Sequence, residues 1–139
     1  MGKIVAIDYG AKRTGIAETD SLQLIASGLT TVSTYDLKEF MLDYLSKEEV
    51  DCLVVGEPKD LKNQNSEIEK SIVPFINFIK KRFKDLEIVR VDERFTSKMA
   101  FQSMIDGGLK KKQRQDKGMI DKVSATIILQ TYLESKSHL

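Results

Sequence analysis

The sequence is poor in the side chains on which several classes of protein depend. Its 139 residues include one cysteine, Cys52, and one histidine, His138. A single cysteine excludes an intramolecular disulfide, and the two residues together cannot supply the usual ligands of a structural zinc ion. They also leave no Ser/His/Asp or Cys/His catalytic system, because His138 is expected to be solvated. Cys52 lies in an apolar run and is expected to be a buried, reduced thiol.

Long apolar runs are missing as well. The longest runs in the sequence are about the length of a strand, far below the roughly 20 residues that a helix needs to span a membrane. No charged-then-apolar signal segment opens the chain. With 41% hydrophobic and 31% charged residues, the chain can bury a core of its own. We expect a single domain over residues 1–139, in the cytoplasm and away from membranes, while the oligomeric state stays open.

The net charge is small, but its distribution along the chain is uneven. Residues 107–118 carry five cations and one acid, a net charge of +4, which leaves −3 for the rest of a chain whose total is +1. A basic, glycine-bounded segment of this kind can attract a polyanion such as nucleic acid, although a solvated flexible loop has the same composition. Its cations are Lys110, Lys111, Lys112, Arg114 and Lys117.

Hydrophobic periodicity predicts an α/β fold. Strand-like runs occupy residues 3–8, 14–18, 25–32, 51–55 and 87–91. Helical spacing of apolar residues occupies residues 36–47, 66–83, 96–106 and 117–135. The short turns between the first three strands favour an antiparallel meander, and the later alternation of strands and helices favours parallel pairing through right-handed crossovers. The predicted order is β-β-β-α-β-α-β-α-α, a mixed five-stranded sheet flanked by helices.

Two of the predicted helices carry local signals. Asp36 and Glu39 have the spacing of an N-terminal cap and its return partner, which predicts a capped start for the first helix. Pro74 removes one backbone donor from the second helix, so we expect that helix to bend or split there.

Three acids stand where an apolar run ends or an amphipathic helix begins. Asp8 closes the first strand-like run, Glu93 lies just past the fifth, and Asp121 stands near the start of the last helix. If two strand ends and one helix start meet in the fold, their carboxylates form a site for a hard cation, Mg²⁺ or Mn²⁺, suited to phosphodiester hydrolysis. Asp92 is expected to point to the opposite face from Glu93, because side chains alternate along a strand.

Glu57, directly after the fourth strand-like run, leaves a choice open. It could be a fourth ligand or a substitute for Glu93, or it could be an exposed loop acid before Pro58.

The turn that follows Asp8 combines two glycines with Lys12 and Arg13. Such a turn lets backbone N–H groups and Arg13 approach a phosphate while Asp8 holds a metal ion beside it. In the alternative interpretation, Asp8 only caps the backbone of a hairpin connection.

Four blocks of residues run in the order of a known family and cover nearly the whole chain. They are Asp8-Tyr9-Gly10 with Arg13 and Gly15-Ile16-Ala17, Val54-Val55-Gly56 with Pro58, Asp92-Glu93-Arg94-Phe95-Thr96, and Ile120-Asp121 with Ser124-Ala125. With these blocks the chain resembles the YqgF family, also called RuvX, of ribonuclease H-like nucleases related to Holliday junction resolvases. The predicted order of strands and helices is also the ribonuclease H-like order.

The resemblance implies a function and an active site. It implies a metal-dependent nuclease of ribosome biogenesis that processes the 5′ end of pre-16S rRNA, with active-site acids at the positions of Asp8, Glu93 and Asp121. Mg²⁺ or Mn²⁺ would be the cofactor and structured RNA the partner. We expect Lys12, Arg13, Arg94 and the basic segment at 107–118 to hold backbone phosphates.

Three alternatives stay open. The same scaffold and acids would serve a Holliday junction resolvase acting on branched DNA. A catalytically silent factor that binds RNA during ribosome assembly would carry the same basic segment. The spacing from Asp8 to Gly15 also resembles the first phosphate loop of actin-like and sugar-kinase ATPases, but those nucleotide-binding proteins close two lobes around ATP and 139 residues provide only one.

Overall fold

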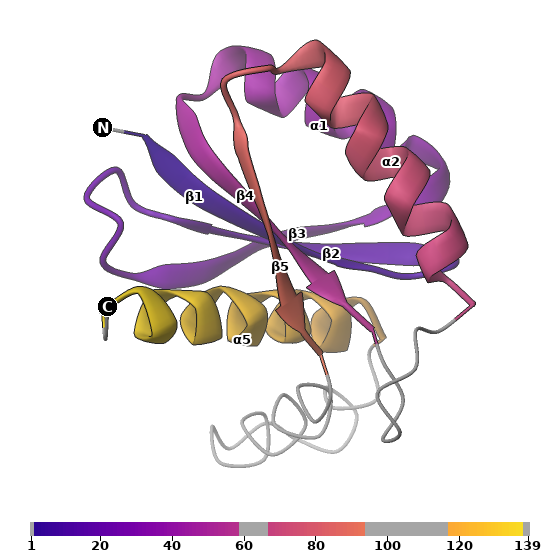
Figure 1. Cartoon of the computed structure of the whole chain (residues 1–139). Helices are drawn as coiled ribbons and strands as arrows, with labels where there is room; N and C mark the ends of the chain where they lie inside the picture. Colours follow the sequence, from indigo (N-terminus) through magenta and orange to yellow (C-terminus); the bar gives the residue numbers. More distant parts are fainter. Residues whose placement is uncertain (1, 59–66, 94–116, 138–139) are drawn as a thin grey trace.

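The computed structural model describes residues 2–58, 67–93 and 117–137 (Figure 1). Its strands are β1 (Lys3–Tyr9), β2 (Arg13–Thr19), β3 (Ala26–Ser33), β4 (Val50–Glu57) and β5 (Glu87–Asp92). Its helices are α1 (Leu37–Lys47), preceded by the short 3₁₀ helix η1 (Thr34–Asp36), α2 (Glu69–Arg82) and α5 (Lys117–Ser137). Every predicted strand is confirmed to within two residues at either end. The helix predicted over residues 96–106 lies outside the described residues.

The five described strands form one mixed sheet in the order β3-β2-β1-β4-β5. β1 pairs with β2 and β2 with β3 in antiparallel fashion, whereas β1 pairs with β4 and β4 with β5 in parallel. The predicted mixed sheet is therefore confirmed. Because β1, β4 and β5 are parallel, their carboxyl ends reach the same edge of the sheet. This edge brings Asp8, the next-to-last residue of β1, close to the ends of β4 and β5.

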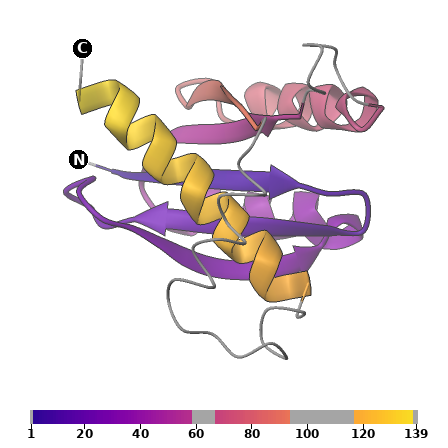
Figure 2. The ribbon, with the colours of Figure 1, turned by 90° about the horizontal axis from the view of Figure 1, so that it is seen from below.

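Helices cover both faces of the sheet. α1 and α2 lie on one face and α5 lies across the other, where it crosses the β1–β2–β3 side of the sheet (Figures 1 and 2). Alternate residues of each strand face opposite layers. Val5 and Ile7 of β1 are fully buried in the cluster under α1 and α2, and Ile4 and Ala6 are fully buried in the cluster under α5. This alternation decides which face each side chain at the strand ends can reach.

One local prediction was wrong, and another was wrong in part. Asp36 makes no side-chain cap bond to α1, because η1 leads directly into the helix and the Leu37 N–H is bonded to the Thr34 carbonyl instead. Pro74 does not split α2, which continues as one helix from Glu69 to Arg82. Proline removes only one backbone bond there, and the buried side chains of α2 on both sides of it hold the helix against the sheet.

Cys52 is a free, buried thiol, as predicted. Within the described residues, no helix has the length and apolar character needed to cross a membrane.

Candidate active site

Asp8 lies near the end of the central strand and faces α5. Ile4 and Ala6, which precede it at two-residue spacing, pack in the cluster under α5, so the alternation of β1 directs Asp8 to the same face. Across the ladder, Asp8 is paired with Gly15 of β2. Asp8 is half-buried. A carboxyl group at this position stands between β2, β4 and α5.

Glu93 reaches the same place from the far side of β4. Its backbone N–H donates to the Glu57 carbonyl at 3.0 Å, which continues the β4–β5 pairing beyond β5. Its side chain lies on Gly56, where a Cβ atom would be 2.5 Å from the Glu93 Cδ and 2.8 Å from its Oε2. The missing side chain at Gly56 therefore makes room for the Glu93 carboxyl, which forms a side-chain hydrogen bond with Asp8.

Asp121 is brought in by a close contact between a helix and a strand. Gly15 faces α5, and a Cβ atom on it would lie 2.0 Å from the Asp121 carbonyl oxygen and 2.9 Å from the Lys122 nitrogen. Because Gly15 is also the ladder partner of Asp8, this contact brings Asp121 next to Asp8. Asp121 lies in the second turn of α5, near the helix start at Lys117, as predicted.

The two strand-end acids perturb each other. Burial raises the pKa of Asp8, and the negative charge of Asp121 acts in the same direction, while the hydrogen bond with Glu93 opposes it. Burial also raises the pKa of Glu93, and the bond with Asp8 and its charge add to this, whereas Arg90 opposes it. Carboxyl groups crowded together away from water are stabilised by a shared proton or by a cation. The pair is therefore of the kind that favours a divalent ion.

Asp121 is engaged by a cation of the protein itself. The Nε of Arg13, the first residue of β2, lies 3.0 Å from the Asp121 Oδ2, with the two side chains 40% and 23% exposed. Consistent with this, no group of three Asp, Glu, His or Cys side chains within residues 2–58, 67–93 and 117–137 is placed to hold one metal ion together. The structure thus joins Asp8 to Glu93 directly and keeps the predicted third ligand beside them in an ion pair.

Glu57 lies on the opposite side of the sheet from Asp8. Leu53 and Val55 pack in the cluster under α1 and α2, so the alternation of β4 puts Glu57 on that face too. The prediction that Glu57 is an exposed loop acid was wrong, because it is the half-buried last residue of β4. Asp92 follows the same rule and lies on the α2 side, as predicted.

The remaining predicted phosphate contacts fall into two groups. Lys12 lies in the exposed turn between β1 and β2, where its carbonyl accepts a hydrogen bond from the Thr34 N–H at 3.0 Å. The other cations have side chains outside the described part of the chain: Arg94, Lys110, Lys111, Lys112, Arg114 and Lys117, the last of which begins α5.

Two kinds of residue near the site were not predicted from the sequence. Gly15 and Gly56 make the close approaches possible, and their only signal is a glycine inside a strand, which often marks such a contact. Arg90 was also missed. It is a cation in the middle of the apolar β5, and its guanidinium binds Glu69 of α2 and the carbonyls of Val55 and Gly56. A charged residue inside a strand-like run was the available signal.

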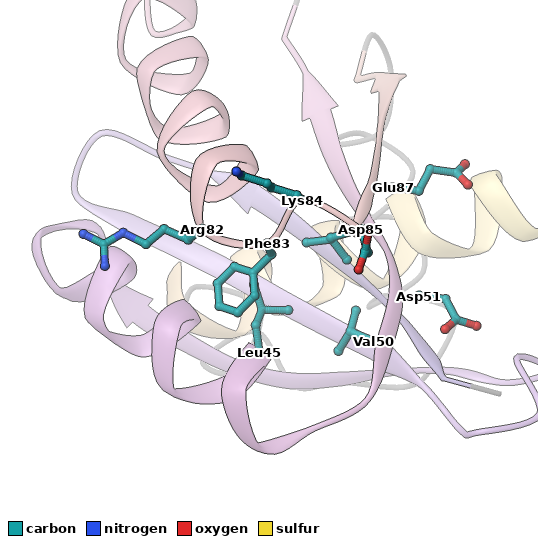
Figure 3. A pocket seen from close by; sticks show the side chains of 9 residues that line it. Leu45, Val50, Asp51, Arg82, Phe83, Lys84, Asp85 and Glu87 are labelled. Carbon is teal, nitrogen blue, oxygen red and sulfur yellow. The ribbon is translucent and has the colours of Figure 1, made fainter.

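A separate hollow lies at the other end of the parallel strands. It measures about 620 Å³ and is lined by Leu45 of α1, by Val50 and Asp51 at the start of β4, and by residues 82–87 (Figure 3). Its lining charges have both signs, including Arg82, Lys84, Asp85 and Glu87. Since the acids stand at the carboxyl ends of β1, β4 and β5, this hollow is not part of the candidate active site.

The arrangement of strands and helices defines the class of protein. The structure is similar to T. thermophilus RuvC, solved in complex with a Holliday junction substrate, with a TM-score of 0.60 over 99% of this chain and 96% of that chain. The sequences are only 14% identical, so this likeness concerns the fold alone. The protein has the ribonuclease H-like fold that its element order predicted.

Comparison of the sequence with known proteins shows its family. The sequence profile described as "RuvX: Holliday junction resolvase" matches residues 2–135. A protein of Phocaeicola vulgatus named "Putative pre-16S rRNA nuclease" is 57% identical over 139 residues, the full length of both chains. A Flavobacterium johnsoniae protein of the same name is 57% identical over 136 residues, 98% of this chain and 99% of that protein. The chain therefore belongs to the RuvX family, which confirms the resemblance seen in its motifs.

Proposed function

We propose that this protein is a divalent-metal-dependent nuclease that hydrolyses phosphodiester bonds in structured RNA, with pre-16S rRNA as its substrate. The observation that carries the proposal is the meeting of Asp8 and Glu93 at one edge of the sheet, with Asp121 beside them. The names of the relatives from Phocaeicola vulgatus and Flavobacterium johnsoniae support the choice of substrate. Such a substrate agrees with the predicted cytoplasmic location.

The donor set fits a hard cation. Asp8, Glu93 and Asp121 offer only carboxylate oxygens, which suit Mg²⁺ or Mn²⁺. When bound, such an ion polarises a phosphoryl oxygen and lowers the pKa of a coordinated water. The crowded pair formed by Asp8 and Glu93 would hold it, and Asp121 would complete the set after leaving Arg13. The strand ends and the close contacts at Gly15 and Gly56 position these acids.

Arg13 links substrate binding to the acids. Its guanidinium is 40% exposed and pairs with Asp121 through one nitrogen, so its remaining N–H groups can meet a phosphate at the surface. A backbone phosphate that draws Arg13 away would free Asp121 for an ion. Lys12, exposed in the same turn, would contact the neighbouring backbone. Arg94 and the cations of residues 107–118 are proposed to extend this path.

A second candidate is the resolution of branched DNA. The family profile bears the description of a Holliday junction resolvase, and the fold is similar to that of RuvC. The acids would act on a DNA phosphodiester by the same chemistry. Only the substrate separates the two proposals.

Cleavage by purified protein tests both. Wild type, Asp8→Asn and the control Asp43→Asn would be incubated with precursor 16S rRNA, or with a four-way DNA junction, in Mn²⁺ and in EDTA. Asp43 is a 63% exposed carboxylate on α1 that pairs with Lys47, so its loss removes the same charge away from the sheet edge. We expect Mn²⁺-dependent cleavage of the RNA by wild type and Asp43→Asn and none by Asp8→Asn.

Each other outcome points to a different function. Equal cleavage by wild type and Asp8→Asn would identify a contaminating nuclease and refute the proposal. Cleavage of the junction in place of the RNA would establish the resolvase. Salt-sensitive RNA binding with no cleavage would indicate an assembly factor, and thermal stabilisation by ATP would revive the nucleotide-binding alternative.

A further inference from the structure

A partly buried ion pair joins the ends of β4 and β5 to α2. The Arg90 Nε donates to the Val55 carbonyl at 3.2 Å, and Nη2 donates to the Gly56 carbonyl at 2.9 Å. The same guanidinium binds both carboxylate oxygens of Glu69, with Nη1 at 3.1 Å from Oε2 and Nη2 in contact with Oε1. One side chain of β5 is therefore bonded to its neighbouring strand and to a helix at once.

The geometry of this contact depends on arginine. The planar guanidinium presents donors in a fixed fork, so it can meet a carboxylate through two nitrogens and still reach the two carbonyls. A lysine at this position keeps the charge but offers one small ammonium group. The side chains of Arg90 and Glu69 are 24% and 11% exposed. The pair is thus held in place by packing as well as by charge.

Gly56 lies between this pair and the candidate active site. Arg90 and Glu69 lie on the α2 side of the sheet, where Arg90 bonds to the carbonyl of Gly56. On the α5 side, the Glu93 carboxyl rests on the Gly56 Cα, where even a Cβ atom would not fit. The next residue, Glu57, accepts the backbone N–H of Glu93. The stretch of β4 that Arg90 holds is therefore the surface that sets the position of Glu93.

We propose that Arg90, held by Glu69, is a positioning residue for Glu93: it fixes the end of β4 so that the Glu93 carboxyl faces Asp8. The consequence for metal binding rests on the proposed function, whereas the position of Glu93 does not. Arg90 acts from the opposite face of the sheet, and its charge also lowers the pKa of Glu93. Its loss would leave the three acids in the sequence and shift the one that stands on Gly56.

Metal affinity is the direct test. Mn²⁺ binding to wild type, Arg90→Lys and the control Lys3→Met would be measured by electron paramagnetic resonance at a temperature where all three are folded by circular dichroism. Lys3 pairs with Glu18 and Glu48 at the opposite end of β1, so its loss removes a comparable ion pair away from the acids. We expect Arg90→Lys to weaken Mn²⁺ binding by roughly 10- to 100-fold, the usual cost of losing a residue that orients a metal ligand. Lys3→Met should bind Mn²⁺ as wild type does.

Glu69→Gln provides a second variant in case Arg90→Lys does not fold. It keeps the guanidinium and its carbonyl contacts but removes the charge that holds it, so we expect a smaller loss in the same direction. Wild-type Mn²⁺ affinity in whichever of the two variants folds would overturn the inference. A loss equal to that of Lys3→Met would also overturn it, because it would reflect general destabilisation.

Failure of the proposed function gives a different result. If wild type itself binds no Mn²⁺, the proposed function fails, and crystal structures of wild type and Arg90→Lys, or Glu69→Gln, decide the inference alone. A Glu93 carboxyl displaced from Gly56 in the variant supports it. A carboxyl that stays on Gly56 and keeps its hydrogen bond with Asp8 refutes it.

Discussion

Gly15→Ala tests the contact that brings α5 to the acids. The new Cβ atom would lie 2.0 Å from the Asp121 carbonyl oxygen, and ordinary contact begins at 3.4 Å, so the helix backbone must retreat by about 1.4 Å. This oxygen belongs to a helical backbone and cannot move alone. The helix would lift from a layer in which Ala125, Ile128 and Leu129 are fully buried.

The expected loss of stability can be set against one opposing effect. Overpacking a core typically costs about 1–3 kcal/mol, and a backbone clash belongs at the upper end, about 3 kcal/mol. Replacing glycine by alanine restricts the unfolded chain and returns about 0.4–1 kcal/mol. We therefore expect Gly15→Ala to lower the free energy of unfolding by about 2 kcal/mol or more. Because a misplacement of about 1 Å can cost roughly 100-fold in rate, RNA cleavage should fall by about that factor.

Gly28→Ala is the matched control. Gly28 is on β3 and also faces α5, but its new Cβ atom would meet the side chain of Lys122, at 2.6 Å from Cγ and 3.0 Å from Cδ. A lysine side chain can move aside, so we expect a change within about 0.5 kcal/mol, as at ordinary surface positions. Guanidinium chloride unfolding and cleavage assays compare the two variants. A Gly15→Ala protein as stable and active as Gly28→Ala would refute the claimed approach of α5.

Three further variants test other parts of the structure. Glu93→Gln should raise the free energy of unfolding in EDTA at pH 8 by about 1.4 kcal/mol or more, the equivalent of one pKa unit. In wild type, the fold raises the pKa of Glu93 from an ordinary 4.5, so the native state holds a proton that the unfolded chain releases. Wild type therefore loses stability as the pH rises above 4.5. Urea unfolding at pH 4 and pH 8 checks this, and an equal gain at both would contradict it. Arg13→Gln should strengthen Mn²⁺ binding in the absence of nucleic acid by up to about fivefold, because an ion pair this exposed is worth at most roughly 1 kcal/mol. The same variant should bind RNA more weakly in a filter assay. Unchanged Mn²⁺ affinity would show that the pairing of Arg13 with Asp121 does not compete with the ion. Thr19→Val should lower the free energy of unfolding by about 2 kcal/mol in a denaturant titration, because valine leaves a buried donor unpaired. That donor is the Ile4 N–H, which the Thr19 hydroxyl accepts at 2.9 Å. A loss below about 0.5 kcal/mol would contradict this role.

The sheet could be predicted because its signals are local. The apolar run from Lys3 to Asp8 and the turn residues after it make a strand that ends near an acid in almost any packing. The helices α1 and α5 follow from the 3.6-residue spacing of their apolar side chains. Pro74 shows the limit of such signals. Its missing donor predicts a helix that bends or splits, but α2 is not split, because packing of the rest of the helix against the sheet outweighs one lost hydrogen bond.

The candidate site likewise has a part with local sequence signals and a part that depends on packing. Strand-end acids are visible in the sequence, and the alternation of side chains along β5 is enough to separate Glu93 from Asp92. Alternation could not decide between Glu57 and Glu93, because these residues belong to different strands and their faces depend on how each strand is set in the sheet. The structure places the Glu93 carboxyl on Gly56, on the same side of the sheet as Asp8.

The sequence by itself predicted the order of the described elements, the mixed sheet and the candidate acids at the strand ends, because the signals for each lie within a few residues along the chain. Only the tertiary structure decided that Gly15 admits the backbone of α5, that Arg13 holds Asp121, and that Arg90 ties Glu69 to the end of β4. Those contacts join residues between 21 and 108 positions apart in the chain. Their geometry arises from the packing of whole elements, which no local pattern of residues records.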